Sequence, residues 1–187
     1  MAGALEGEGI EAIFASDLAR AFDTASAIAD RLGLPIVVDT GLRERSFGIF
    51  QGSTYAEIDV RWPAEALRWR RHDPEFGPPD GETLRDFNAR AVATATRIAA
   101  GQPGRTIAIV THGGVLDCLY RAASRIDLYA PRSWELGNAA VNRLLYTPAG
   151  FSLVGWSDTS HLEGDRPLDD ESEGDAPVAA PAPLVRS

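Results

Sequence analysis

The sequence predicts a single α/β domain built around a parallel sheet, and three observations support this prediction. Short apolar runs alternate with stretches of helical periodicity along most of the chain. The run at residues 107–110 is continuously apolar, as expected for a strand that is buried on both faces. The chain has 187 residues, of which 44% are hydrophobic, so it is long enough to form one domain with a substantial core.

Residues 106–114, Thr-Ile-Ala-Ile-Val-Thr-His-Gly-Gly, form the most informative stretch. His112 stands where the strand ends, and Gly113 and Gly114 lead into a helical pattern over residues 115–123. A strand, a glycine turn and a helix N-terminus form a crevice that attracts anions, and a histidine there can carry a proton or a phosphoryl group near neutral pH. Alone, such a histidine more often only ends a strand. The helix is predicted to bury Val115, Leu116, Leu119 and Tyr120.

The first strand and helix are predicted at residues 10–15 and 17–32. Ser16 or Asp17 is a suitable N-cap, and Gly33 is a suitable C-cap. Arg20 would lie in the first turn, where its guanidinium can help the helix dipole to hold an anion. The alternative for this arginine is a solvated surface charge. The apolar face is predicted to contain Leu18, Phe22, Ala25, Ala29 and Leu32.

A second buried strand is predicted at residues 35–39, followed by a loop at residues 42–52 that mixes charges, aromatic residues and glycines. Glu44 lies between Arg43 and Arg45 in this loop. It is either one partner of a surface ion pair or a carboxyl group tuned to act as a general acid.

Two helical segments follow. The first covers residues 54–69 and is broken or restarted at Pro63. The second covers residues 82–100, after a loop rich in proline and glycine. The strands predicted at residues 139–146 and 151–156 form a hairpin. The second helix is predicted to place Leu84, Phe87, Ala91, Ala95 and Ile98 on one face.

Two further groups of polar residues have competing interpretations. Arg68, Arg70, Arg71 and His72 form a basic cluster in an acidic protein. A solvated helix end is favoured for this cluster over a patch that binds a second anionic group of a substrate. His161, near the end of the folded part, is predicted to be a satisfied structural histidine.

Composition excludes several classes of protein. The net charge of −9 argues against nucleic acid as the main partner. No stretch approaches the ~20 apolar residues of a membrane span, and the first residues do not resemble a signal peptide. A single cysteine, Cys118, excludes an internal disulfide and favours the reducing cytoplasm. Residues 163–187 are acidic and rich in proline and alanine, so we predict a domain at residues 1–162 and a disordered tail.

Several motifs follow one another along the chain. They are Ser-Asp-Leu-Ala-Arg-Ala at 16–21, Leu-Arg-Glu-Arg-Ser-Phe-Gly at 42–48, Gly-Glu-Thr-Leu at 81–84, Thr-His-Gly-Gly at 111–114, the asparagines at 138 and 142 with Arg143, and Trp-Ser-Asp-Thr-Ser-His-Leu at 156–162. In this order they resemble the histidine phosphatase superfamily, which is also called phosphoglycerate mutase-like, and in particular its phosphatase branch. The resemblance covers roughly residues 5–162. The fold it implies is a three-layer sandwich with a mostly parallel sheet.

The resemblance also implies a catalytic site. His112 corresponds to the second catalytic histidine, which hydrogen-bonds the transferring phosphoryl group. Arg20 corresponds to the phosphate-clamping arginine and Glu44 to the general acid that protonates the leaving oxygen. Arg45, Gly113 and Gly114 are predicted to bind the substrate, a phosphorylated small molecule. No metal or other cofactor is required, and no nucleic acid or membrane partner is expected; a homo-oligomer is possible.

The sequence departs from the family at its start. It contains no Arg-His-Gly-Glu motif, which in the family ends the first strand and supplies the nucleophilic histidine. Residues 1–10 resemble the end of the family's first helix, so the first strand, the nucleophile loop and most of that helix are expected to be absent. A gene start placed too late is favoured over a truncated, catalytically dead remnant. In the family the missing strand is central and lies beside the strand that ends at His112, so its loss is expected to expose two sheet edges and to make the chain poorly soluble or associate.

The function predicted on this basis is hydrolysis of phosphomonoesters through a phosphohistidine, with the nucleophilic histidine absent from the chain. The alternatives are a phosphoglycerate mutase and a non-catalytic phosphate-binding remnant. Cys118 is rejected as a substitute nucleophile because no glycine-bearing phosphate loop follows it.

Overall fold

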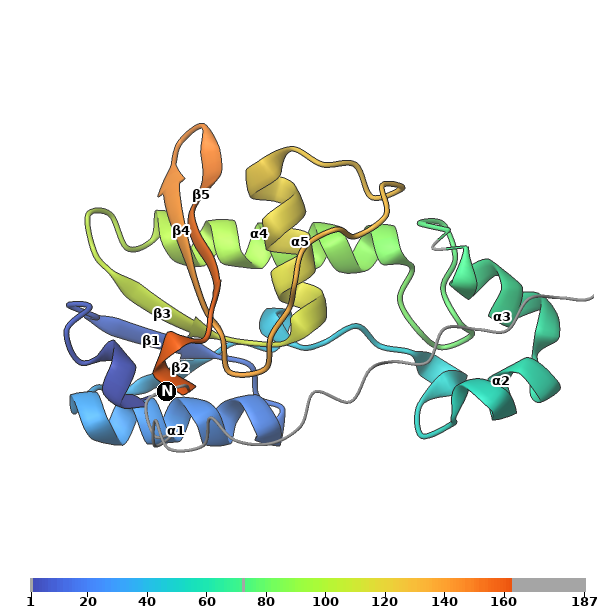
Figure 1. Cartoon of the computed structure of the whole chain (residues 1–187), viewed down its shortest axis with the longest axis horizontal. Coiled ribbons are helices and arrows are strands. Elements are labelled where there is room, and N and C mark those ends of the chain that lie inside the picture. Colours follow the sequence, from blue (N-terminus) through green and yellow to red (C-terminus); the bar gives the residue numbers. More distant parts are fainter. Residues whose placement is uncertain (1, 72, 163–187) are drawn as a thin grey trace, which may run out of the picture.

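The structure, a computed structural model, describes residues 2–71 and 73–162 and has a parallel three-stranded sheet at its centre (Figure 1). The strands are β1 (Ala12–Ala15), β2 (Ile36–Val38) and β3 (Ile107–Val110), in the order β2-β1-β3. Ile13 lies opposite Ile36 in β2 and opposite Ala108 in β3. All three strands therefore end at the same edge of the sheet.

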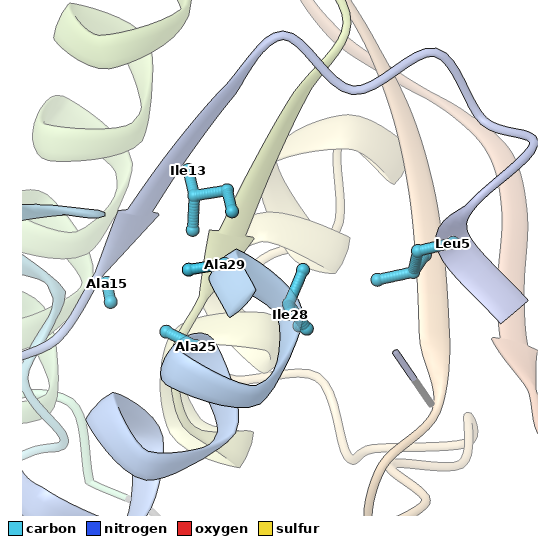
Figure 2. Packing of buried hydrophobic residues seen from close by; sticks show 6 residues of the cluster. All are labelled: Leu5, Ile13, Ala15, Ala25, Ile28 and Ala29. Carbon is cyan, nitrogen blue, oxygen red and sulfur yellow. The ribbon is translucent and has the colours of Figure 1, made fainter. Parts of the chain in front are cut away.

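Helices cover both faces of this sheet, which confirms the predicted three-layer α/β sandwich. Helix α1 (Ala19–Leu32) lies below the sheet in Figure 1, and α4 (Leu84–Ala100) lies above it. Successive residues of β1 point to opposite faces. Figure 2 shows Ile13 on the α1 side, whereas Phe14 packs with Leu42 and Ile98 on the α4 side.

Helix α1 begins two residues later than the sequence predicts. Its N-cap is Leu18, which makes no side-chain capping bond. The Ser16 hydroxyl instead accepts a hydrogen bond from the Leu18 N–H at 3.3 Å, and Asp17 pairs with Arg43. The predicted N-cap is therefore wrong, because both side chains serve contacts outside the helix.

The apolar face of α1 is also rotated from the predicted one. Phe22 is 37% exposed and does not belong to the core. The buried side is made mostly of small residues, which let the helix approach the sheet closely. The buried residues are Ala21, Ala25, Ile28 and Ala29.

Strand β2 is an edge strand and not the buried strand predicted from its composition. Val37 is 49% exposed and Val38 is 47% exposed, because β2 has a single strand neighbour. The expectation of two open edges beside a missing central strand stays a prediction: among the described strands β3 pairs with β1 alone, and β4 and β5 form a separate sheet.

The C-terminal part of the fold packs on α4. Helix α5 (Gly113–Ser124) contacts α4 and β5, and the strands β4 (Val141–Thr147) and β5 (Gly150–Asp158) form the predicted antiparallel hairpin. The core between these elements contains Phe87, Ala91, Ala95, Val115, Cys118 and Leu119. Of the residues predicted to be buried in α5, Leu116 and Tyr120 are only half-buried.

Residues 48–71 and 73–76 form a separate aromatic lobe, at the right of Figure 1. It contains the short 3₁₀ helix η3 (Gly48–Phe50), α2 (Tyr55–Arg61) and α3 (Pro63–Arg70). Thr54 and Glu57 form a capping box, and the break at Pro63 occurs as predicted. The lobe has its own core of Phe50, Ile58, Ala66 and Phe76, with Phe47, Ile49, Trp62 and Trp69 around it.

The solvated interpretation of the basic cluster is confirmed for its two paired arginines, since Arg68 pairs with Asp73 and Arg70 with Asp59. His72 and the predicted tail at residues 163–187 lie outside the described residues.

The remaining short helices are η1 (Ala2–Leu5), η2 (Thr40–Leu42) and η4 (Ser160–Leu162). His161 in η4 is not the satisfied histidine predicted from the sequence: its Nε2 atom is buried without a hydrogen-bond partner among the described residues. Within the same residues, no helix combines the length and the apolar character needed to span a membrane.

Candidate active site

Two polar side chains meet where β1 and β3 end. Ser16 directly follows β1, and His112 is the N-cap residue of α5, two residues beyond the end of β3. The His112 Nε2 atom lies 2.9 Å from the Ser16 hydroxyl oxygen, and both residues are buried. The Ser16 N–H also donates to the Val110 carbonyl at 3.0 Å. The imidazole is therefore held in one orientation at the edge of the sheet.

The charges around His112 come from three other segments of the chain. Burial lowers the pKa of His112 below 6.5, and the positive charge of Arg20 lowers it further, whereas the carboxylates of Glu44 and Asp17 oppose this shift. The imidazole is therefore mainly neutral at pH 7. Arg20, Glu44 and His112, predicted separately from the sequence, lie close enough for their charges to interact.

The carboxylate of Glu44 lies over the first turn of α5. Its Oε2 atom accepts a hydrogen bond from the Gly114 N–H at 3.0 Å, and its Oε1 atom accepts one from the Arg45 N–H at 2.9 Å. A Cβ atom on Gly114 would lie 2.2 Å from Glu44 Oε1 and 3.1 Å from the Phe87 ring. A glycine is thus required here if the carboxylate is to reach the positive end of the helix.

The loop that carries Glu44 is held by an ion pair that the sequence analysis missed. Arg90 of α4 donates from Nε and Nη2 to the two carboxylate oxygens of Glu82, both at 2.7 Å. Arg90 Nη1 also donates to the carbonyls of Gly41 at 2.9 Å and Arg43 at 3.0 Å. Arg90 lies far from Glu44 in the sequence, so no local pattern connects the two residues.

Glu82 also binds the loop of Glu44 directly. Its Oε2 atom accepts a hydrogen bond from the Ser46 N–H at 2.9 Å. Desolvation favours the neutral form of Glu82, but the hydrogen bonds from Arg90 and Ser46 and the charges of Arg90 and Arg45 outweigh it and lower the pKa. Glu82 therefore remains a charged anchor for residues 41–46.

Arg20 and Arg45, the two arginines predicted for the site, differ in the groups that surround them. Arg20 is exposed and forms no ion pair with the acidic residues that the structure describes. Arg45 donates to the Glu82 and Phe76 carbonyls at 3.1 and 2.8 Å, so its guanidinium ties the loop to residues 76–82. Burial lowers the pKa of Arg45. Its role in substrate binding stays a prediction.

A cavity of about 630 Å³ opens beside the N-terminus of α5. Gly113 and Gly114 line this cavity, and their role in substrate binding stays a prediction. The other lining residues belong to the long connection between α5 and β4, namely Arg132, Trp134, Glu135, Leu136 and Gly137. No group of three or more His, Cys, Asp or Glu side chains within the described residues is arranged to hold a metal ion.

Cys118 lies in α5 but takes no part in the site. It is 1% exposed, and burial raises the pKa of its thiol to about 12, so it is not a nucleophile at neutral pH. The site thus offers a guanidinium, an imidazole and a carboxylate beside a helix N-terminus. Together these groups can bind an oxyanion and move a proton to or from it.

Comparison with known proteins identifies a family and several relatives that resemble this chain. A family model, the histidine phosphatase superfamily (branch 1), matches residues 1–159. The glucosyl-3-phosphoglycerate phosphatase of Mycobacterium tuberculosis (strain CDC 1551 / Oshkosh) is 36% identical over 141 residues, which are 71% of this chain and 63% of that protein. Phosphoglycerate mutase-like protein 4 of Arabidopsis thaliana is 35% identical over 158 residues, covering 82% of this chain and 67% of that protein. The chain therefore spans only part of the length of the mycobacterial relative.

Solved structures agree with these sequence relationships. The mycobacterial glucosyl-3-phosphoglycerate phosphatase in complex with VO3 superimposes with a TM-score of 0.72 at 32% identity, covering 84% of this chain and 81% of that one. YhfR of Bacillus stearothermophilus has a TM-score of 0.77 at 29% identity and covers 86% of this chain and 80% of its own. The match of the family model, these structures and the ordered motifs lead to one conclusion: the chain belongs to the histidine phosphatase superfamily.

Proposed function

We propose that this site binds the phosphoryl group of a small phosphate monoester and serves its hydrolysis. The observation that carries the proposal is the convergence of Arg20 and Glu44 on a buried, neutral His112 beside the N-terminus of α5. The reaction needs positive charge and oriented donors around the phosphoryl oxygens, because its transition state spreads negative charge over them.

Each of the three side chains has a distinct role in this proposal. Arg20 binds the phosphoryl oxygens, since it is exposed and has no acidic partner among the described residues. His112 hydrogen-bonds the same group during its transfer. Glu44 donates a proton to the leaving oxygen as the bond from phosphorus to that oxygen breaks, and it later takes a proton from the attacking water.

The proposed mechanism passes through a phosphohistidine, and its nucleophile is not assigned within this chain. The sequence contains three histidines, His72, His112 and His161, and no Arg-His-Gly motif. We therefore expect the chain to bind phosphate without turning over an ester. A form extended at its N-terminus by a strand ending in Arg-His-Gly is expected to hydrolyse one.

The substrate class proposed for this chain is a phosphorylated small molecule, handled in the cytoplasm. By its name, the mycobacterial relative acts on glucosyl-3-phosphoglycerate. No narrower substrate is carried over from it, because the chain covers 63% of that protein.

The proposal is tested by titrating inorganic phosphate into the chain by calorimetry, and by following p-nitrophenyl phosphate hydrolysis in the extended form. We expect Arg20→Gln to weaken phosphate binding by ~10-fold or more, and to slow the extended form by at least ~100-fold. Arg31→Gln is the matched control, because Arg31 lies on the same helix but pairs with Glu6 at the surface. Equal effects of the two substitutions, or rapid hydrolysis by the chain alone, would contradict the assignment.

Experiments on the chain and on its extended form also distinguish two other functions from hydrolysis. A phosphoglycerate mutase is favoured by the name of the Arabidopsis relative, and it would move phosphate between the hydroxyls of phosphoglycerate without releasing it. Phosphorus NMR distinguishes this transfer from hydrolysis. A non-catalytic phosphate-binding remnant would bind phosphate but stay inactive even in the extended form.

A further inference from the structure

The connection between α5 and β4 brings an additional cation to the candidate site. Arg132 lines the same cavity as Gly113 and Gly114 at the N-terminus of α5. It is exposed and forms no ion pair with any acidic residue in the described part of the chain. Glu135, which lines the same cavity, is not its partner.

Most arginines that the structure describes have an acidic partner, in a protein whose net charge is −9. Two more are engaged otherwise: Arg45 bonds to carbonyls and Arg61 stacks on Trp62. Four described arginines have none of these partners: Arg20 and Arg132 lie at the candidate site, whereas Arg71 and Arg125 lie at the C-terminal ends of α3 and α5. The arginines with acidic partners are Arg31, Arg43, Arg68, Arg70, Arg85, Arg90, Arg97, Arg105, Arg121 and Arg143.

The connection between α5 and β4, which contains Arg132, is held against α5 by Arg121. Arg121 is 8% exposed and donates from Nη1 to the carbonyls of Asp127 at 2.7 Å and Ala130 at 3.0 Å. Its guanidinium lies 4.7 Å from the centre of the Trp134 ring, which also stacks on Tyr120 at 4.2 Å. Arg132 therefore lies between two anchored positions, Ala130 and Trp134.

The same connection is anchored at Glu135 as well. The Trp156 indole N–H donates to the Glu135 carbonyl at 2.8 Å. Because its flanking residues are held, the backbone at Arg132 has less conformational freedom to lose when a ligand binds than the backbone of a free loop would have.

We infer that Arg132 is a specificity-determining residue that binds a second anionic group of the substrate, while Arg20 and His112 hold the phosphoryl group. This inference rests on the proposed function of the site. The cavity of about 630 Å³ that Arg132 and the glycines of α5 line is large enough for a small phosphate ester. The second group is a carboxylate or a second phosphate, both of which match the guanidinium fork.

The basic cluster considered in the sequence analysis is a weaker candidate for this second anion. Arg68 and Arg70 already pair with Asp73 and Asp59. An anion binding there would have to displace these carboxylates, whereas at Arg132 it would meet a guanidinium that no acidic side chain neutralises among the described residues.

The test measures the affinities of four ligands by calorimetry. Three share a three-carbon chain: propyl phosphate, phosphorylated 3-hydroxypropanoate and propane-1,3-diol bisphosphate. The fourth, inorganic phosphate, reports on the phosphoryl site alone. We expect at least one of the two ligands with a second acid group to bind ~10-fold more tightly than propyl phosphate. Arg132→Gln should remove most of this gain and leave the affinity for inorganic phosphate unchanged. The ligand that shows the gain tells whether the second group is a carboxylate or a phosphate.

The matched control is Arg125→Asn, which removes the same charge at the opposite end of α5. Arg125 has a φ of 57°, a conformation that asparagine tolerates. This variant should keep the full gain. If the wild type binds both two-acid ligands no more tightly than propyl phosphate, or if Arg132→Gln keeps the gain, the inference fails while phosphate binding still supports the proposed function. If no phosphate compound binds, the proposed function fails, and the inference fails with it.

Discussion

The loop of Glu44 and the neighbouring aromatic lobe are held in place by different kinds of contact. The loop depends on polar contacts from distant elements, chiefly Arg90, Glu82 and Gly114. The lobe depends on apolar contacts between residues that are close in the sequence, with Phe50 at its centre. A polar site of this kind is sensitive to the loss of single donors, whereas an apolar core loses stability in proportion to the volume removed.

The largest effect is expected from Phe50→Ala in the lobe. Phe50 is 3% exposed, and its ring lies 5.5 Å from that of Trp62 and 5.4 Å from that of Trp69. Truncating a buried phenylalanine costs about 4 kcal/mol of unfolding free energy, which urea denaturation measures. Phosphate affinity should change less than ~3-fold, because no contact of Phe50 reaches His112. A large loss of phosphate affinity in a folded Phe50→Ala protein would show that the two regions are coupled.

The next effect is expected from Arg90→Ala. This change removes the hydrogen bonds to Glu82 and leaves that half-buried carboxylate without its partner, so we expect a loss of about 3 kcal/mol in unfolding free energy. Phosphate binding should weaken as well, because the loop of Glu44 loses its support. Arg85→Ala is the control on the same helix: Arg85 pairs with Glu75 in an exposed position, so it should cost less than about 1 kcal/mol. Similar losses in both variants would mean that the Arg90 pair gives the loop no special support.

A smaller effect is expected from Gly114→Ala. The new methyl group would meet Glu44 Oε1 at 2.2 Å and force the carboxylate away from the helix, at a cost of about 1 to 2 kcal/mol in unfolding free energy. Gly113→Ala is the neighbouring control, since nothing lies within 4 Å of its added Cβ. Thermal unfolding of the two variants, followed by circular dichroism, measures the difference. If Gly114→Ala melts no lower than Gly113→Ala, the contact between Glu44 and α5 is not a stabilising one.

Features that depend on neighbouring residues in the sequence could be predicted, whereas features that depend on contacts between distant residues were missed. The strand before His112 and the helix after it depend on local periodicity, and both could be predicted. Arg20 and Glu44 were found by the order of motifs, and the structure brings both to His112. Arg90 was missed because the loop carbonyls it binds lie far from it in the sequence, and Arg132 because it has no acidic partner within the part of the chain that the structure describes. Neither arrangement leaves a local pattern in the sequence.

The errors in the fold have the same origin. The valines of β2 look like a buried strand, but exposure depends on how many strands lie beside it, which the local sequence does not encode. The sequence around Ser16 is typical of a helix N-cap, but the Ser16 hydroxyl forms a hydrogen bond with His112 at the edge of the sheet. In both cases a tertiary neighbour decides the outcome over local preference.

The smallest effect concerns the pH dependence of anion binding. Burial and Arg20 hold the pKa of free His112 below 6.5. A bound anion favours the imidazolium and raises this pKa, so binding takes up a proton. Affinity should therefore increase as the pH falls through the bound-state pKa, by at most ~10-fold per pH unit, and should level off below the pKa of the free protein. Sulfate is the suitable probe, because it keeps its charge throughout this range.

His112→Asn should flatten this dependence, and Glu44→Gln separates the contribution of the carboxylate beside it. Folding stability should show the opposite trend. The folded protein binds the His112 proton less readily than the unfolded chain does, so the contribution of His112 is complete above pH 6.5 and is lost as the pH falls below it. A sulfate affinity that stays constant between pH 5 and pH 8 in the wild type would show that His112 does not meet the bound anion. In that case Arg20 and the helix N-terminus would have to hold the anion without the imidazole.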